Sequence, residues 1–215
     1  MPRRNTQDVF INCAFDKAFE DSFQAIVFAV LACGFNVRCA LETLDGTETR
    51  IEKLYRIIEQ SRYSVHDLSR TELDETSGLP RFNMPLELGI FLGAKRFGSG
   101  DQEEKRCLIL DLQRYRFQSF ISDLAGMDVV DHGGDPQRIV EKVRDWLVAV
   151  SRRKTIPGTA AILDSYNRFA SALPDLAHTA GFKVADLIYP DYERLVLAWV
   201  KRERLEVRTS IRPAI

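Results

Sequence analysis

Residues 107–111 read Cys-Leu-Ile-Leu-Asp and form the clearest strand candidate of the chain. An apolar run of this length, closed by an aspartate, is typical of a strand that is covered on both faces of a sheet. Four further segments of strand length lie on either side of it, at residues 9–13, 36–40, 63–67 and 127–131. The sequence therefore predicts five strands, most of them buried.

Helical patterns alternate with these strands. Apolar residues recur at helical spacing over residues 19–31, 51–58, 84–94, 117–124 and 136–150. Strands that alternate with helices imply right-handed crossovers and a mostly parallel sheet covered on both faces. The expected fold is α/β, with a flavodoxin-like, doubly wound, mostly parallel five-stranded sheet.

The pattern changes after residues 151–158, which combine charge with proline and glycine and suggest a linker. Two more helices are predicted beyond it, at 160–173 and 190–205, the second with an apolar stripe of Leu195, Val196, Trp199 and Val200. We expect an α/β domain over residues 7–151 and a helical C-terminal extension over 158–215. The extension has little core of its own, so it should pack on the sheet domain or on a second copy of it.

Composition does not predict binding to nucleic acid or to a membrane. A net charge of −1 over 215 residues provides no footprint for nucleic acid or an anionic membrane. The longest apolar run, Ala25–Cys33, is far shorter than the ~20 residues of a membrane span. No secretory signal is visible, and the cysteines lie in apolar patterns without metal spacing. We expect a cytoplasmic protein with reduced thiols, no metal and no cofactor.

Glu87 is the residue whose position most needs a functional explanation. At about 100° per residue it falls between Ile90 and Phe91, inside the apolar arc of the predicted short helix. Burying a carboxylate costs several kcal/mol unless it is paired or faces a cleft. A place near the helix start, with Asn83 as a cap, returns only ~0.3–1 kcal/mol. A glutamate that bends out to solvent is the structural alternative, but we expect Glu87 to be used.

Ligands of open parallel sheets bind at the carboxyl ends of the strands, beside the point where the strand order reverses. The side chains expected at that edge near Glu87 are the candidate substrate-binding residues Phe15, Asp16, Glu42, Asp67, Ser69, Arg81 and Asn83. Asp67 with Ser69 could equally form an ordinary Asx turn. We expect structural roles for Asp111 and Asp131, which also follow strands.

The residue types at this edge favour one kind of chemistry. Neither a phosphate-binding glycine motif nor an activated Ser or Cys nucleophile is evident. One dominant carboxylate suits cleavage of a C–N glycosidic bond, because it can stabilise or trap an oxocarbenium-like transition state. Asp or Asn side chains would hold ribose hydroxyls, Phe15 or Phe82 would stack on the base, and an arginine such as Arg70 would hold a phosphate.

The sequence Val-Phe-Ile-Asn-Cys-Ala-Phe-Asp at residues 9–16, together with Asp67 and Glu87-Leu88-Gly89, resembles the nucleoside 2-deoxyribosyltransferase-like proteins and the related TIR domains. The likeness covers residues 7–151. It implies that Glu87 is the catalytic carboxylate, that Phe15 and Asp16 lie beside the sugar, and that Asp67 orients the site. The chain departs from both families: Arg81-Phe82-Asn83 replaces the usual Asp-x-Gly element, and the Ser or Cys with Trp of TIR enzymes is missing.

These observations lead to three hypotheses. The first is an N-glycosidase that cleaves NAD, as a substrate, or a related nucleotide or nucleoside; the resemblance also implies an effector of bacterial antiviral defence. The second is a non-catalytic nucleotide-sensing or TIR-like signalling module. The third is an assembly subunit that buries Leu195, Val196 and Trp199 against a partner. The expected partners are a nucleotide or nucleoside and, through the C-terminal helices, a second copy or another protein.

Overall fold

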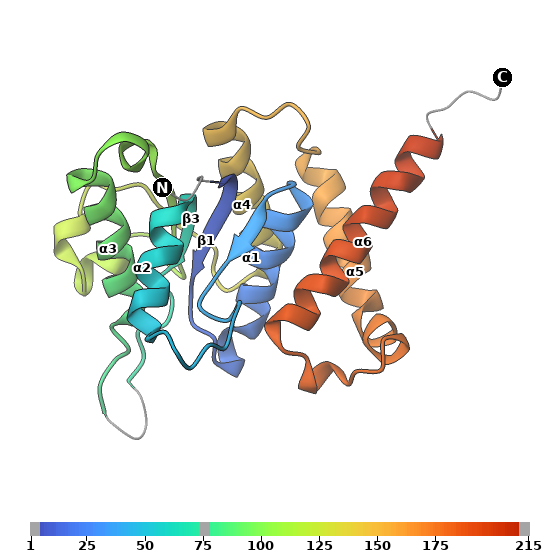
Figure 1. The fold of residues 1–215 in the computed structure, drawn as a ribbon, viewed down its shortest axis with the longest axis horizontal. Helices are drawn as coiled ribbons and strands as arrows, with labels where there is room; N and C mark the ends of the chain where they lie inside the picture. The colour runs from blue at the N-terminus through green and yellow to red at the C-terminus, as the bar shows by residue number, and fades with distance from the viewer. Residues whose placement is uncertain (1–4, 74–77, 211–215) are drawn as a thin grey trace.

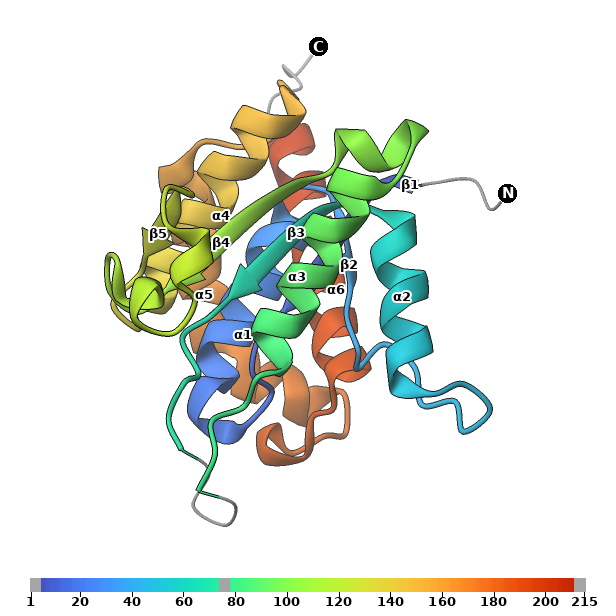
Figure 2. The same ribbon diagram turned by 90° about the vertical axis from the view of Figure 1, so that its left-hand side faces the viewer.

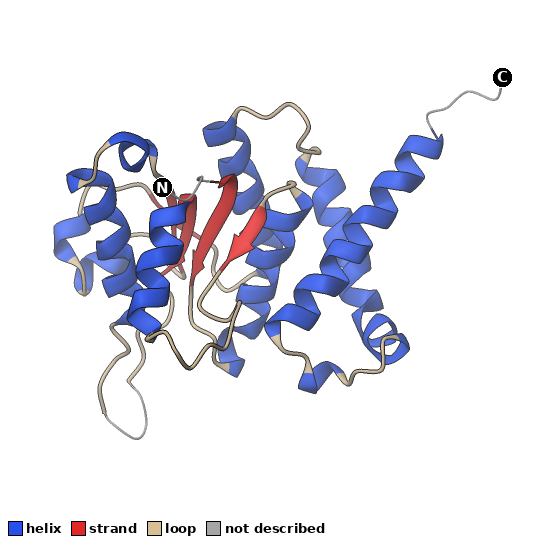
Figure 3. Ribbon diagram, viewed as in Figure 1, coloured by secondary structure: helices blue, strands red, loops and turns tan. Residues whose placement is uncertain are grey.

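The computed structural model describes residues 5–73 and 78–210, and its centre is a five-stranded parallel sheet. The strands are β1 (Asn5–Asn12), β2 (Asn36–Arg38), β3 (Ser61–Asp67), β4 (Arg106–Asp111) and β5 (Val129–Asp131). They lie in the order β2-β1-β3-β4-β5 and every neighbouring pair is parallel. Figure 3 shows strands of the sheet in red between the helices. The flavodoxin-like fold expected from the sequence is therefore confirmed.

Helices cover both faces of the sheet. They are α1 (Glu20–Ala32), α2 (Arg50–Gln60), α3 (Asn83–Phe97), α4 (Pro136–Ser151), α5 (Thr159–Thr179) and α6 (Tyr189–Ser210). Figure 1 shows α2 and α3 on one face, α1 and α4 on the other, and α5 and α6 as a further layer beyond α1. In Figure 2, which faces the first of these sides, α3 lies over the sheet, where it contacts β1 and β3.

Helix α1 is apolar on nearly every side because it has neighbours on every side. All six residues from Ala25 to Val30 have no exposed surface. The sheet covers one face of α1, and α4, α5 and α6 cover the others. Because the sheet and three helices surround α1, the longest apolar run of the sequence is a core helix and not a membrane span. Within residues 5–73 and 78–210, no helix is both long enough and apolar enough to cross a bilayer.

The C-terminal helices share the core of the sheet domain. Val196 has no exposed surface, and Trp199 and Val200 are each 7% exposed. The Trp199 ring packs against Phe169 of α5 at 5.7 Å, and Phe169 in turn lies 5.4 Å from Phe28 of α1. The predicted stripe is therefore covered within the chain itself, which corrects the hypothesis that it is left open for a partner.

Two predicted elements differ from the structure. The segment expected as a helix over 117–124 forms two 3₁₀ helices, η3 (Arg116–Ser119) and η4 (Ser122–Leu124). Only Phe117 of these two turns is buried, so too little apolar contact is present to stabilise a continuous α-helix of this length. Helix α3 has 15 residues, so it is not the short helix that the sequence suggested. The remaining 3₁₀ turns are η1 (Lys17–Phe19), η2 (Gly100–Glu104) and η5 (Val184–Asp186).

Candidate functional site

The carboxyl ends of β1 and β3 define the switch point of the sheet. These strands are neighbours, and the chain proceeds from β1 to β2 on one side and from β3 to β4 on the other. Asn12 and His66 are paired in register beside this point, and Asp67 ends β3. Helix α3, which carries Glu87, follows β3 in the chain. The doubly wound fold therefore places Glu87 close to the position where such sheets bind ligands.

Glu87 points inward, as the sequence predicts. It is only 6% exposed and shares its helix face with the buried side chains of Met84, Leu88 and Phe91. Its carboxyl group forms no hydrogen bond or ion pair with any residue that the structure describes. Burial raises the pKa of Glu87 to about 7, while the positive charge of Arg50 at the start of α2 acts to lower it. Glu87 is therefore a desolvated carboxyl group without a partner, and a position in bulk solvent is excluded.

Asn12 holds the beginning of α3 against β1. Its side-chain Nδ2 donates one hydrogen bond to the Met84 carbonyl oxygen at 2.8 Å and another to His66 Nδ1 at 2.9 Å. Because a carbonyl only accepts, the first bond fixes the orientation of the amide. Asn83 does not cap the helix, contrary to the prediction: the N-cap residue is Phe82, without a side-chain hydrogen bond, and Asn83 is exposed.

His66 is neutral and acts as a structural bridge. Its Nδ1 accepts from Asn12, so the ring proton resides on Nε2, which donates to Ser64 Oγ at 2.9 Å. Complete burial lowers the pKa of His66 to about 3. Sequence reasoning did not assign Asn12 and His66 to the site. The available signal was one polar residue at or next to the carboxyl end of each of the two strands.

Asp67, Ser69 and His132 form a buried network that joins the ends of β3 and β5. Asp67 Oδ1 accepts from the Ser69 amide at 2.9 Å, which is the predicted Asx turn, and Ser69 Oγ lies 2.9 Å from His132 Nε2. The other ring nitrogen, Nδ1, accepts from the Gly134 amide at 3.1 Å. His132 Nε2 therefore carries the proton and donates it, so His132 cannot act as a base toward Ser69. The network holds the loops after β3 and β5 together, and it contains no activated nucleophile.

Asp16 connects the loop after β1 with the loop after β3. Its Oδ2 lies 3.1 Å from Arg70 Nε and 3.6 Å from Arg81 Nη1, and Arg70 also pairs with Glu72 at 2.8 Å. The other carboxylate oxygen, Oδ1, is buried and accepts no hydrogen bond. The site thus contains an unsatisfied acceptor beside two guanidinium groups.

The buried thiol of Cys13 follows directly after β1. Burial raises the pKa of Cys13, and the charges of Asp67, Glu87 and Asp16 raise it further. Among the candidate residues, the structure joins Ser69 to Asp67 by a hydrogen bond and Arg81 to Asp16 by an ion pair, whereas it joins Glu87 to neither acid.

Two candidate residues have other contacts. Phe15 is half-buried and packs edge-to-face on Phe23 at 5.1 Å, within the core. Glu42 forms a two-point ion pair with Arg38, at 2.7 and 2.8 Å, and Arg38 also contacts Asp8. These contacts occupy Glu42 and Arg38 in linking β2 to β1.

Asp111 and Asp131 follow the structural prediction made for them. Asp111 is completely buried and bonds to Arg116, whose guanidinium also donates to the carbonyl oxygens of Leu68 and Ser69. Asp131 pairs with Arg138 at 3.0 Å. Both aspartates therefore hold loops in place at the sheet edge.

The placement of the His, Cys, Asp and Glu side chains bears on whether the site can hold a metal ion. Within the described residues, no group of three or more His, Cys, Asp or Glu side chains is placed to hold a metal ion. All four cysteines are free thiols, as expected.

Surface cavities of about 710 and 300 Å³ lie along α5, and Glu87 lines neither of them. The sequence matches no protein-family model and is not similar to any curated protein, so the geometry alone supports a functional proposal.

Proposed function

We propose that the protein is an N-glycosidase in which the Glu87 carboxylate promotes cleavage of the N-glycosidic bond of NAD or a related nucleotide or nucleoside. The observation that carries this proposal is a carboxyl group that is buried beside the switch point of the sheet and has no partner there. A desolvated carboxyl group without a hydrogen-bond or ion-pair partner is costly to keep. Carboxyl groups with a perturbed pKa are frequent at functional sites, because catalysis needs a pKa that is matched to the reaction.

Cleavage breaks the bond between C1′ of the sugar and a nitrogen of the base, and the base leaves with the electron pair. The positive charge that develops on the sugar is attracted by a carboxylate at close range. At 4 Å this attraction is about 1 kcal/mol in water and about 4 kcal/mol in a medium of effective dielectric constant 20. The burial of Glu87 therefore increases the stabilisation that its ionised form provides. Water or another acceptor then forms the new bond to C1′.

NAD suits a site with a single reactive carboxyl group. Its nicotinamide ring is positively charged and leaves as a neutral molecule without taking up a proton. A neutral purine needs a general acid as well, and the nearby His132 and His66 are engaged in structural hydrogen bonds. The chemistry of the leaving group therefore favours NAD among the candidate substrates.

The neighbours of Glu87 provide groups for the rest of such a substrate. The unsatisfied Oδ1 of Asp16 can accept a hydrogen bond from a sugar hydroxyl. Arg70 and Arg81, which already meet at Asp16, carry donors suited to a phosphate group. Phe82 is 65% exposed at the start of α3 and offers a ring on which a base can stack.

The proposal is tested by incubating the purified protein with NAD, with mononucleotides and with deoxynucleosides, and measuring the products by chromatography and mass spectrometry. The proposal requires free base from at least one of these compounds. The sensing hypothesis requires a different result: a compound that raises the melting temperature increasingly as its concentration rises and is recovered intact. Intact recovery of all the compounds would reject the glycosidase proposal.

A further inference from the structure

The larger surface cavity lies on a different side of the molecule from Glu87. Its volume is about 710 Å³, and it is bounded by the end of α1, the segment after α4, the start of α5 and the second half of α6. This volume is within the range of about 300–1,000 Å³ that is usual for small-molecule sites. Its walls include the apolar side chains of Ile162, Val200 and Cys33, which are nearly completely buried.

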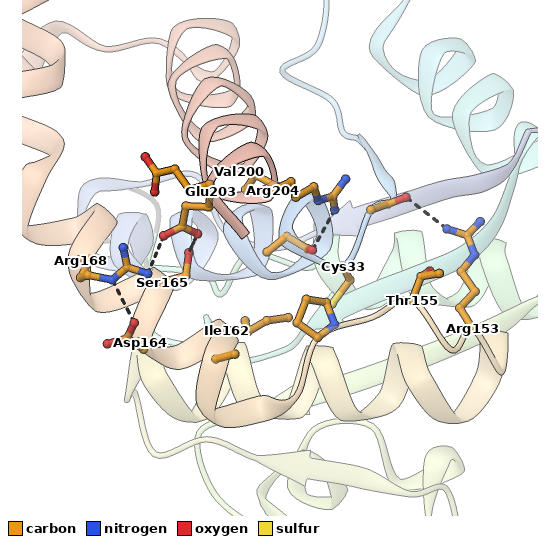
Figure 4. A pocket seen from close by; sticks show the side chains of 15 residues that line it. Cys33, Arg153, Thr155, Ile162, Asp164, Ser165, Arg168, Val200, Glu203 and Arg204 are labelled. Carbon is orange, nitrogen blue, oxygen red and sulfur yellow. Dashed lines mark hydrogen bonds and ion pairs between the residues drawn. The ribbon is translucent and has the colours of Figure 1, made fainter. Parts of the chain in front are cut away.

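One side of this cavity carries a network of one arginine and two acidic side chains (Figure 4). Arg168 pairs with Asp164 at 2.9 Å and with Glu203 at 2.6 Å. Glu203 also accepts a short hydrogen bond from Ser165, whose Oγ receives the Trp199 Nε1 proton at 3.2 Å. These side chains pair with one another and join α5 to α6.

The other side carries two arginines that form no ion pair with a described residue. Arg153 donates to the Gly34 carbonyl at 3.2 Å, and Arg204 donates to the Ala32 carbonyl at 3.2 Å (Figure 4). Both contacts lie at the C-terminal end of α1. The dipole of a helix provides the equivalent of only about half a negative charge at that end. Glu206 also lines the cavity, but it pairs with Arg202. The two positive charges of Arg153 and Arg204 therefore exceed what the helix end alone compensates.

We propose that this cavity binds a small organic anion with an apolar body, whose phosphate or carboxylate group is held by Arg153 and Arg204. Each guanidinium group has five N–H donors, and the described contacts use one donor of each. An apolar body would contact Ile162, Val200 and Cys33 on the inner wall. Arg168 is already paired, so the anionic group is expected on the side of the two unpaired arginines.

Calorimetric titration tests this site with two probes that differ by one group, 2-naphthyl phosphate and 2-naphthol. We expect the phosphate ester to bind at least about tenfold more tightly, which is the effect of 1.4 kcal/mol. The variants Arg153→Gln and Arg204→Gln are each expected to remove most of this preference. Arg194→Gln is the matched control, because Arg194 lies on the same helix, pairs with Asp191 and does not line the cavity. The control should bind both probes as the unchanged protein does.

A third variant tests whether the phosphate ester binds inside the cavity. Ala161 is an exposed residue of α5 that lines the cavity, so Ala161→Trp fills the space while both arginines remain. It should prevent binding of the phosphate ester and leave the melting temperature nearly unchanged. Glu87→Gln should bind the ester normally, which separates this site from the proposed glycosidase site. The proposal is rejected if the ester does not bind, if it binds no more tightly than 2-naphthol, or if the arginine and Ala161 variants bind it normally.

Discussion

The side-chain amide of Asn12 lies 2.8 Å from the main-chain carbonyl of Met84, and this hydrogen bond fastens the first turn of α3 to the end of β1. Glu87 is three residues further along the same helix, so its carboxyl group is positioned relative to the sheet edge through this contact. The same amide also holds His66, in β3. The side chain of one buried asparagine thus links both strands at the switch point to the helix that carries Glu87.

Replacing Asn12 with alanine should therefore destabilise the fold. The change removes two hydrogen bonds. A buried hydrogen bond contributes about 0.5–1.5 kcal/mol, and leaving His66 Nδ1 buried without a donor costs about 1–3 kcal/mol, whereas the Met84 carbonyl keeps its helical hydrogen bond. We expect the free energy of unfolding in urea to fall by about 2–4 kcal/mol on that basis. Asn83→Ala is the control: this asparagine is exposed and caps nothing, so its loss should change the stability by less than about 0.5 kcal/mol.

Glu87→Gln should increase stability at alkaline pH. The pKa of Glu87 is raised from 4.5 to about 7 in the folded state, so between these values the folded protein holds a proton that the unfolded chain has released. Stability from this group therefore falls as the pH rises from about 4.5 to about 7, by on the order of 3 kcal/mol in total. Urea unfolding of the variant and the unchanged protein should differ by on the order of 2–3 kcal/mol more at pH 8 than at pH 5. A difference that does not depend on pH would contradict the buried, unpaired carboxyl group.

His66 should remain neutral throughout the range in which the protein is folded. Burial lowers its pKa from 6.5 to about 3, so its contribution has the opposite sign: stability is lost as the pH falls from about 6.5 toward 3. In nitrogen-15 NMR spectra the ring should show the Nε2–H tautomer and no titration between pH 5 and pH 8. A titration midpoint above pH 5 would show that the Asn12–His66–Ser64 chain of hydrogen bonds is not formed as described.

Phe169→Ala should destabilise the whole molecule and not only its C-terminal helices. The Phe169 ring is 1% exposed and contacts the rings of Phe28, Tyr192 and Trp199. Truncation of such a residue costs about 3–5 kcal/mol. Because α1 shares this core, circular dichroism and tryptophan fluorescence should report one common unfolding transition at a lower temperature. Leu197→Ala, at a half-exposed position of α6, should leave the transition nearly unchanged; two separate transitions in the Phe169 variant would indicate an independent extension.

The sequence predicted the sheet well because strand and helix patterns are local. Apolar runs such as residues 107–111 and the helical spacing of 136–150 reflect burial on one or two faces, and burial follows from the alternation of elements. The wrong prediction of an α-helix over residues 117–124 has a local cause as well. Its apolar residues fit a helical face, but Tyr115 adopts a left-handed conformation and the segment folds back in short turns.

The candidate site was predictable only in part. The inward position of Glu87 followed from its place in the helical pattern, and that prediction is confirmed. The roles of Asn12 and His132 depend on contacts across 72 and 63 residues of chain, with Met84 and with Ser69, which no local pattern reveals. The ion pair that occupies Glu42 joins it to Arg38, at helical spacing in a segment that is not a helix. The apolar stripe of α6 could be recognised, but whether the chain or a partner covers it depended on the packing of α1.

The most direct test of the central claim is the rate of base release from NAD, or from whichever compound of the panel is cleaved, by the unchanged protein and by Glu87→Gln. Glutamine keeps the shape of the side chain and removes its charge, so the account predicts that the rate falls by at least about a hundredfold. Glu59→Gln, at an exposed glutamate of α2, should retain full activity. Equal rates for Glu87→Gln and the unchanged protein would contradict the account, because the reaction would then proceed without the carboxylate that the fold buries at the edge of its sheet.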